Sequence, residues 1–171
     1  MMKERKNKKN NSVTTLELLE SVLKEEGWKY EIQGPDPSDG SYYFFVTFDG
    51  EIFMINTLPH NSFISIAKMR FISEMVGVHD GYQVIRTVNR VNQQMPQRTY
   101  YFYTDVDGKK ELVISTITEI LWISGMPAQG EYLRVTFENL NKSQSMLKDI
   151  LSRHKETYYM PVFIKRSPYI A

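Results

Sequence analysis

Residues 42–57 read YYFFVTFDGEIFMINT, and this segment carries the clearest structural pattern in the sequence. Two runs of aromatic and β-branched residues, 42–48 and 51–57, flank the dipeptide Asp49-Gly50. Such residues favour strands, and Asp-Gly between two strands favours a two-residue type I′ turn in which both residues take positive φ. We therefore predict an antiparallel β-hairpin here.

The rest of the predicted sheet lies on both sides of this hairpin. Residues 28–33 and 63–72 each form a further strand-like run. Residues 100–106 and 111–123 flank a second Asp-Gly pair, Asp107-Gly108, and predict a second hairpin. The sequence therefore predicts a twisted antiparallel sheet of five or six strands.

Three helices are expected around that sheet. Thr14 and Glu17 have the spacing of a capping box at the start of the first helix, and Gly27 ends it. Residues 80–95 carry apolar side chains at helical spacing, and a long amphipathic helix begins near Glu131. The fold class is therefore α+β, in the order α-β-β-β-β-α-β-β-α, with residues 13–155 as a single domain.

Composition excludes several classes of protein. The chain has 171 residues, no Cys and a net charge of +1, which excludes disulfide frameworks, thiolate metal sites and cysteine nucleophiles. The first ten residues carry a charge of +4, and residues 1–12 are expected to be a disordered basic tail. With neither a signal-peptide pattern nor a membrane span, we expect a cytoplasmic protein that does not contact membranes.

The candidate catalytic and metal-binding residues do not have the spacing that such sites require. His60, His79 and His154 are not spaced as metal ligands, and the run from Asp105 to Gly108 lacks the later residues of a calcium loop. The aromatic strand 45–48 matches only the end of an RNA-binding consensus, which makes nucleic acid an unlikely partner. We expect no enzyme activity, no metal and no cofactor.

Aromatic side chains occupy both faces of the predicted strands, whereas one layer of helices covers a single face. The uncovered face needs the C-terminal tail, residues 156–171, or a partner protein, which includes a second copy of the chain. The candidate partner-binding residues are Tyr43, Phe45, Tyr100, Phe102 and Trp122.

Two amides stand out in the second helix. Asn89 and Asn92 are three residues apart and share a helix edge, although Asn is a poor helix former. We favour a structural role in which a side-chain amide satisfies the backbone of an adjacent strand or loop. Ligand recognition together with Arg86 and Gln93 is the alternative.

Several of these segments resemble the YbjN-like family. The resemblance rests on Gly27-Trp28-Lys29-Tyr30, on Phe45 to Gly50, on Val88-Asn89-Arg90-Val91-Asn92 and on Asp105 to Gly108, and it covers residues 16–151. It implies a bacterial protein with a fold like that of type III secretion chaperones, often dimeric, and with no established reaction. The near-neutral charge and greater length depart from those chaperones.

These observations together favour a non-enzymatic binding module, chaperone-like or regulatory. It would capture a protein segment on the sheet face or at an edge strand. A small-molecule-binding regulator with a pocket near Asn89 and Asn92 is the alternative. A hydrolase comes third, and it would require His60 or His79 to pack against a carboxylate.

Overall fold

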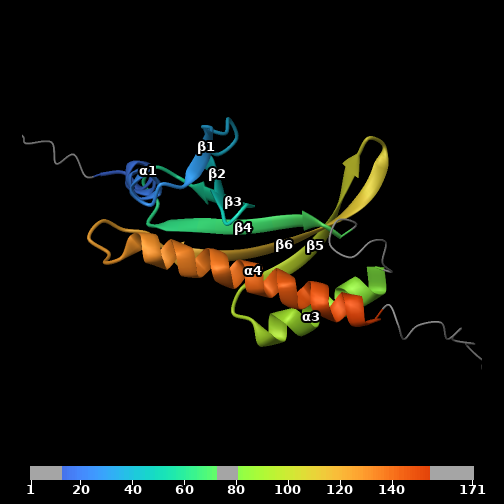
Figure 1. Cartoon of the computed structure of the whole chain (residues 1–171). Helices are drawn as coiled ribbons and strands as arrows, with labels where there is room; N and C mark the ends of the chain where they lie inside the picture. Colours follow the sequence, from blue (N-terminus) through green and yellow to red (C-terminus); the bar gives the residue numbers. More distant parts are fainter. Residues whose placement is uncertain (1–12, 73–80, 155–171) are drawn as a thin grey trace, which may run out of the picture. The chain divides into compact units, whose positions relative to one another are not determined.

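The computed structural model of the chain describes residues 13–72 and 81–154. Figure 1 shows its elements in the expected α+β order. They are α1 (Thr15–Glu25), β1 (Lys29–Gln33), β2 (Tyr42–Phe48), β3 (Glu51–Thr57), β4 (Phe63–Phe71), α3 (Gly81–Gln94), β5 (Arg98–Val106), β6 (Lys109–Leu121) and α4 (Gln129–His154). The tails predicted at 1–12 and 156–171 lie outside the described residues.

The strands form one antiparallel sheet in the order β1-β2-β3-β4-β6-β5. β2 pairs with β3 from Tyr42 opposite Thr57 to Phe48 opposite Glu51, as expected for a two-residue turn. Asp49 and Gly50 both have positive φ, 49° and 75°, which fits a type I′ turn. Asp107 and Gly108 repeat this geometry with φ of 52° and 78°, so both predicted hairpins are confirmed.

The chain divides into two compact units, each built from separate stretches of sequence. Residues 13–68 and 117–140 make up the described part of the first unit. The second contains 69–72, 81–116 and 141–154 of the described residues. β4, β6 and α4 each contribute to both units, and the single domain expected over residues 13–155 stays a prediction.

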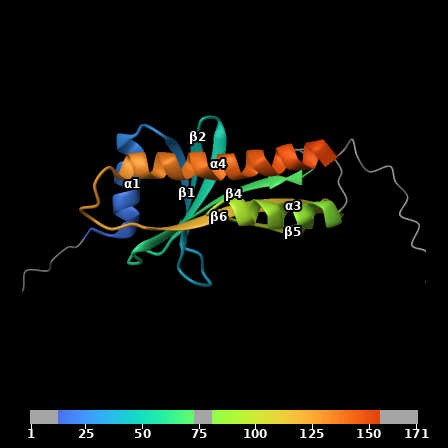
Figure 2. The same cartoon turned by 90° about the horizontal axis from the view of Figure 1, so that it is seen from below.

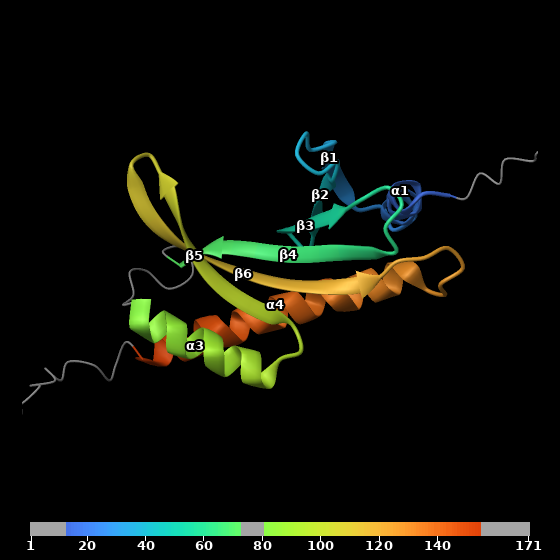
Figure 3. The same cartoon turned by 180° about the vertical axis from the view of Figure 1, so that it is seen from behind.

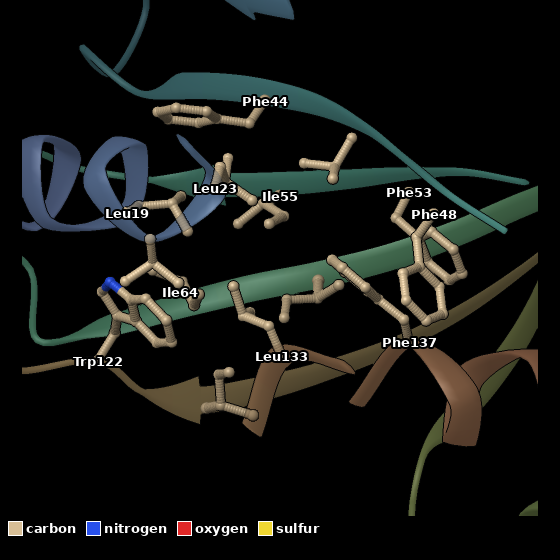
Figure 4. Packing of buried hydrophobic residues seen from close by; sticks show 14 of the residues in the cluster. Leu19, Leu23, Phe44, Phe48, Phe53, Ile55, Ile64, Trp122, Leu133 and Phe137 are labelled. Carbon is tan, nitrogen blue, oxygen red and sulfur yellow. The ribbon is translucent and has the colours of Figure 1, made fainter. Parts of the chain in front are cut away.

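The first unit has an aromatic core (Figure 4). The buried face of β2 carries Phe44, Val46 and Phe48, and it packs with side chains from α1, β3 and the first half of α4. The rings of Phe53 and Phe137 stack with centroids 4.4 Å apart. Residues more than 80 positions apart in sequence therefore share this core.

The start of α1 is fixed by its own cap and by a neighbouring loop. The Thr14 side chain accepts the Glu17 N–H, while the Glu17 carboxylate accepts the Thr14 N–H at 2.9 Å, which confirms the capping box. The Thr15 N–H donates to the carbonyl of Pro59 at 2.9 Å. The helix therefore begins against the segment that joins β3 to β4.

The second unit has a smaller, aliphatic core. Val84, Val88 and Val91 of α3 pack with Ile114 of β6 and with Leu147 and Leu151 of α4. Figure 2 shows α3 and the C-terminal part of α4 running side by side. The helical spacing that predicted α3 is therefore the spacing of its buried face.

Candidate functional site

The strongest candidate surface is β5, which is an edge strand of the sheet (Figure 3). Four consecutive aromatic residues lie in its middle, and all of them are exposed to solvent. Their exposed fractions are 43% for Tyr100, 37% for Tyr101, 37% for Phe102 and 59% for Tyr103. Edge strands offer backbone groups for pairing, and proteins usually protect them with charges or short length. Here the charged residues Arg98 and Asp105 lie towards the ends, outside the aromatic run.

The aromatic rings of β5 alternate between the two faces of the strand, as strand geometry requires. Tyr100 and Phe102 share one face, where their rings lie 6.1 Å apart at an interplanar angle of 30°. Tyr103 lies on the other face with Thr99, on the side of α3, because a Cβ added to Gly81 would lie 3.0 Å from the Tyr103 hydroxyl. The strand therefore presents an aromatic pair on the face away from α3.

The backbone of β5 is open along only part of its length. The Asn92 side chain donates to the Thr99 carbonyl and accepts the Thr99 N–H, both at 2.7 Å, as a neighbouring strand would. Thr99 therefore directs its backbone groups away from β6. Because this direction alternates along an antiparallel strand, the backbones of Tyr101 and Tyr103 also point outwards.

Both Asn residues lie on the exposed surface of α3, and Asn92 hydrogen-bonds to the backbone of β5. Asn92 has the structural role that we favoured for the pair, since its amide satisfies a strand backbone and is not available to a ligand. Asn89 is exposed on α3. A small-molecule site built on both amides is not supported by these contacts.

Tyr43 and Phe45 lie in the first unit, on the face of β2 opposite its buried residues. In the ladder, Phe45 stands beside Glu31 of β1 and Met54 of β3. A shallow hollow of about 320 Å³ lies over Phe45 and Thr47, with Ile52 and Tyr30 among its walls. This face combines apolar surface with one carboxylate, Glu31.

The Tyr30 side chain lies on the core face of β1, near Phe44 and α1, and hydrogen bonding holds it there. Its hydroxyl donates to Glu20 at 3.0 Å, and Lys24 contacts the same carboxylate at 2.7 Å. The hydrogen bond from Lys24 and then that from Tyr30 lower the pKa of Glu20, while burial raises the pKa of Tyr30. The phenol therefore stays neutral and keeps its place at physiological pH.

The prediction that Trp122 belongs to a partner-binding face needs correction. Its side chain is 1% exposed and lies in the aromatic core of the first unit. Alternation explains the error, because the sequence shows two faces at residues 121–123 but not which one the core covers. Leu121 and Ile123 are the exposed members, each at 42%.

A hydrolase site has little support in the described residues. His60 lines a hollow at the start of α1, and no Asp or Glu is among the described residues that line it. His79 and the side chain of His154 lie outside the described part of the chain. Asp105 accepts the Gly108 N–H at 2.8 Å and so belongs to the turn. No cluster of three metal-ligating side chains occurs within 13–72 and 81–154.

Sequence reasoning missed part of this surface. Tyr101 and Tyr103 were not among the candidates, although Tyr103 is the most exposed aromatic residue of β5. Four aromatic residues in a row were visible in the sequence, but the strand order was not, and only that order identifies β5 as an edge. The two predicted pairs, Tyr43 with Phe45 and Tyr100 with Phe102, belong to different compact units.

One solved structure supports the fold. An uncharacterized protein from Methanothermobacter thermautotrophicus superimposes with a TM-score of 0.57 at 15% identity, over 81% of this chain and 98% of that one. YbjN of E. coli, described as a proposed transcription regulator, matches with a TM-score of 0.44 at 9% identity, over 82% of this chain and 91% of that one. The similarity to YbjN is a distant structural one, so family membership stays a prediction.

The sequence comparisons found no counterpart: no family model matches the chain, and no curated protein does.

Among the described residues, no helix has the length and apolar character needed to span a bilayer.

Proposed function

We propose that the chain is a non-enzymatic protein-binding module that captures an extended protein segment by strand addition to β5. The observation that supports this proposal is an edge strand with four exposed aromatic residues in its middle. In strand addition, main-chain hydrogen bonds supply affinity, and alternate side chains supply specificity. Tyr101 and Tyr103 would provide the main-chain groups, while Tyr100 and Phe102 would contact the side chains of the segment.

β5 suits this role better than the opposite edge of the sheet. β1 has only five residues, and Lys29 and Glu31 place charges along it. Short, charged edges resist pairing. β5 has nine residues, and its aromatic run is free of charges. The captured segment should therefore be uncharged over its central residues, with aromatic or aliphatic side chains at alternate positions.

Selection of peptides tests this proposal. Random peptides displayed on phage are selected on the immobilised full chain, and the binders are synthesised and titrated by fluorescence anisotropy. We expect the binders to share an alternating apolar pattern. Binders with no common pattern, or with a helical spacing of apolar residues, would contradict strand addition.

Two variants at one position separate main-chain pairing from ring contact. Tyr101→Ala removes the ring and keeps the outward N–H, whereas Tyr101→Pro removes both. We expect Tyr101→Pro to weaken binding at least about tenfold more than Tyr101→Ala, a difference of about 1.4 kcal/mol. Tyr132→Ala is the control, because Tyr132 is exposed to the same degree, 38%, on α4. Equal loss in both Tyr101 variants would reject main-chain pairing.

A second copy of the chain is another candidate for the protein segment that pairs with β5. Light scattering coupled to size exclusion, on the full chain and on a chain ending at Lys155, distinguishes this case. A dimer that dissociates in Tyr101→Pro would identify a second β5 as the captured strand. A dimer that depends instead on residues 156–171 would place the interface elsewhere.

A further inference from the structure

A second hollow, of about 240 Å³, lies in the first unit at the start of α1. Its walls come from the first turn of that helix, from the segment between β3 and β4, and from the residues that follow β6. These segments are held together by backbone hydrogen bonds, from Thr15 to Pro59 and from Trp122 to Ser62 at 2.7 Å. The hollow is therefore part of the folded structure of this unit.

The feature that points to a ligand is the indole N–H of Trp122. This residue lines the hollow and is 1% exposed. Its Nε1 atom has no hydrogen-bond acceptor among the described residues. In Figure 4 the nitrogen lies on the side of the ring towards α1, away from Leu133. Because indole is a donor only, and a buried donor without an acceptor is unfavourable, an acceptor atom placed in the hollow within reach of Nε1 would be stabilised.

The other walls indicate the character of the ligand. Leu18, Pro59 and Ile123 contribute apolar surface, while His60 and Ser124 add polar groups. At about 30 Å³ per water molecule, the volume equals about eight water-sized groups. The hollow therefore suits a compact molecule that is partly apolar.

The charge at the start of α1 argues against an anion. The Glu17 carboxylate accepts both the N–H and the hydroxyl of Thr14, which lines the hollow. The Thr15 N–H already donates to Pro59. Two of the donors that usually attract anions to a helix start are thus occupied, and a negative charge lies beside them.

We propose that this hollow binds a small uncharged acyl compound, such as a primary amide. Its carbonyl oxygen would accept the Trp122 Nε1–H, and its apolar part would lie against Leu18, Pro59 and Ile123. This site is independent of the proposed strand addition, because all its described walls belong to the first unit and β5 belongs to the second.

Titration with isobutyramide tests the proposal on the full ¹⁵N-labelled chain. The chain has two tryptophans, so two indole N–H signals are expected, and Trp28→Phe assigns them. Isobutyramide should shift the Trp122 indole proton downfield with saturation and leave the Trp28 signal in place. Isobutyrate should bind more weakly because of Glu17, and isobutylammonium should produce no such shift because it has no acceptor.

Two substitutions locate the site. Ser124→Leu fills the hollow and should weaken isobutyramide binding at least about tenfold. Ser21→Leu changes an exposed serine of α1 outside the hollow and should leave binding unchanged. Trp122→Phe should abolish isobutyramide binding while keeping most of the ring packing. If this variant does not fold, Ser124→Leu alone tests whether isobutyramide binds in the hollow.

Three results would overturn the proposal. One is a Trp122 signal that isobutyramide does not move, which would mean that water alone satisfies the indole N–H. Another is an equal shift in wild type and Ser124→Leu. The last is isobutyrate binding as tightly as the amide, which would indicate an anion site.

Discussion

At the scale of single residues, Asn92 has the clearest energetic role. Its amide makes two hydrogen bonds to Thr99, and Thr99 is buried. Asn92→Ala should lower the free energy of unfolding by about 1–3 kcal/mol, since two part-buried backbone groups of Thr99 lose their partners. Urea denaturation followed by circular dichroism measures this change.

Asn89→Ala is the matched control for that substitution. Asn89 lies one turn away on the same helix and is exposed, so the change to Ala tests helix propensity alone. We expect a gain of at most about 0.7 kcal/mol. A similar loss in both variants would mean that the contact with Thr99 does not stabilise the protein.

Glu17 gives a prediction of pH dependence. Hydrogen bonds from the Thr14 N–H and then from its hydroxyl lower the pKa of Glu17. A carboxyl with a lowered folded-state pKa stabilises the protein above its unfolded-state pKa, and this contribution disappears as the pH falls through the folded-state pKa. Glu17→Gln should therefore reduce stability at neutral pH and flatten the loss of stability on acidification.

Thermal unfolding of both proteins across the acid range measures this effect. Glu25→Gln, an exposed carboxylate in the last turn of the same helix, serves as the control. If Glu17→Gln keeps the wild-type slope below the ordinary pKa of glutamate, the capping box is not the source of the pH dependence.

At the scale of elements, β5 should tolerate proline at some positions only. Tyr101 directs its N–H outwards, whereas the N–H of Phe102 points towards β6. Relative to the alanine variants at the same positions, Phe102→Pro should cost about 1–3 kcal/mol more, and Tyr101→Pro should cost at most about 0.5 kcal/mol. Equal costs at both positions would mean that the outward backbone of Tyr101 is also paired.

The sequence predicts the local elements of this structure but not the order of its strands. Both hairpins and the cap of α1 could be predicted, because Asp-Gly turns and the Thr14-Glu17 pair depend on residues close in sequence. The placement of β6 between β4 and β5 could not, since it depends on pairing between distant strands. The candidate surface depends on that placement, which explains why Tyr101 and Tyr103 were missed. Trp122 was misplaced for another reason, because the sequence does not show which face of the strand the core covers.

At the scale of the whole molecule, the first unit should not fold from its N-terminal stretch alone. Five of the fifteen buried residues of its core come from the later stretch: Ile120, Trp122, Leu133, Phe137 and Leu140. At about 1.5–3 kcal/mol each, their loss removes about 7–15 kcal/mol of burial, as much as the whole stability of a typical domain. A fragment of residues 1–68 should therefore give a poorly dispersed NMR spectrum, while a well-dispersed spectrum would refute this account.

The discontinuous first unit also constrains how the protein is made. The stretch up to Lys68 is synthesised before residues 69–140, a further 72 positions. At about 5–20 residues per second, this delay is about 4–14 s. During this time Phe44 and Phe53 have no Phe137 to pack against, so the nascent chain exposes an aromatic hairpin that is prone to aggregate. We expect this interval to be when the protein most needs a chaperone of its own.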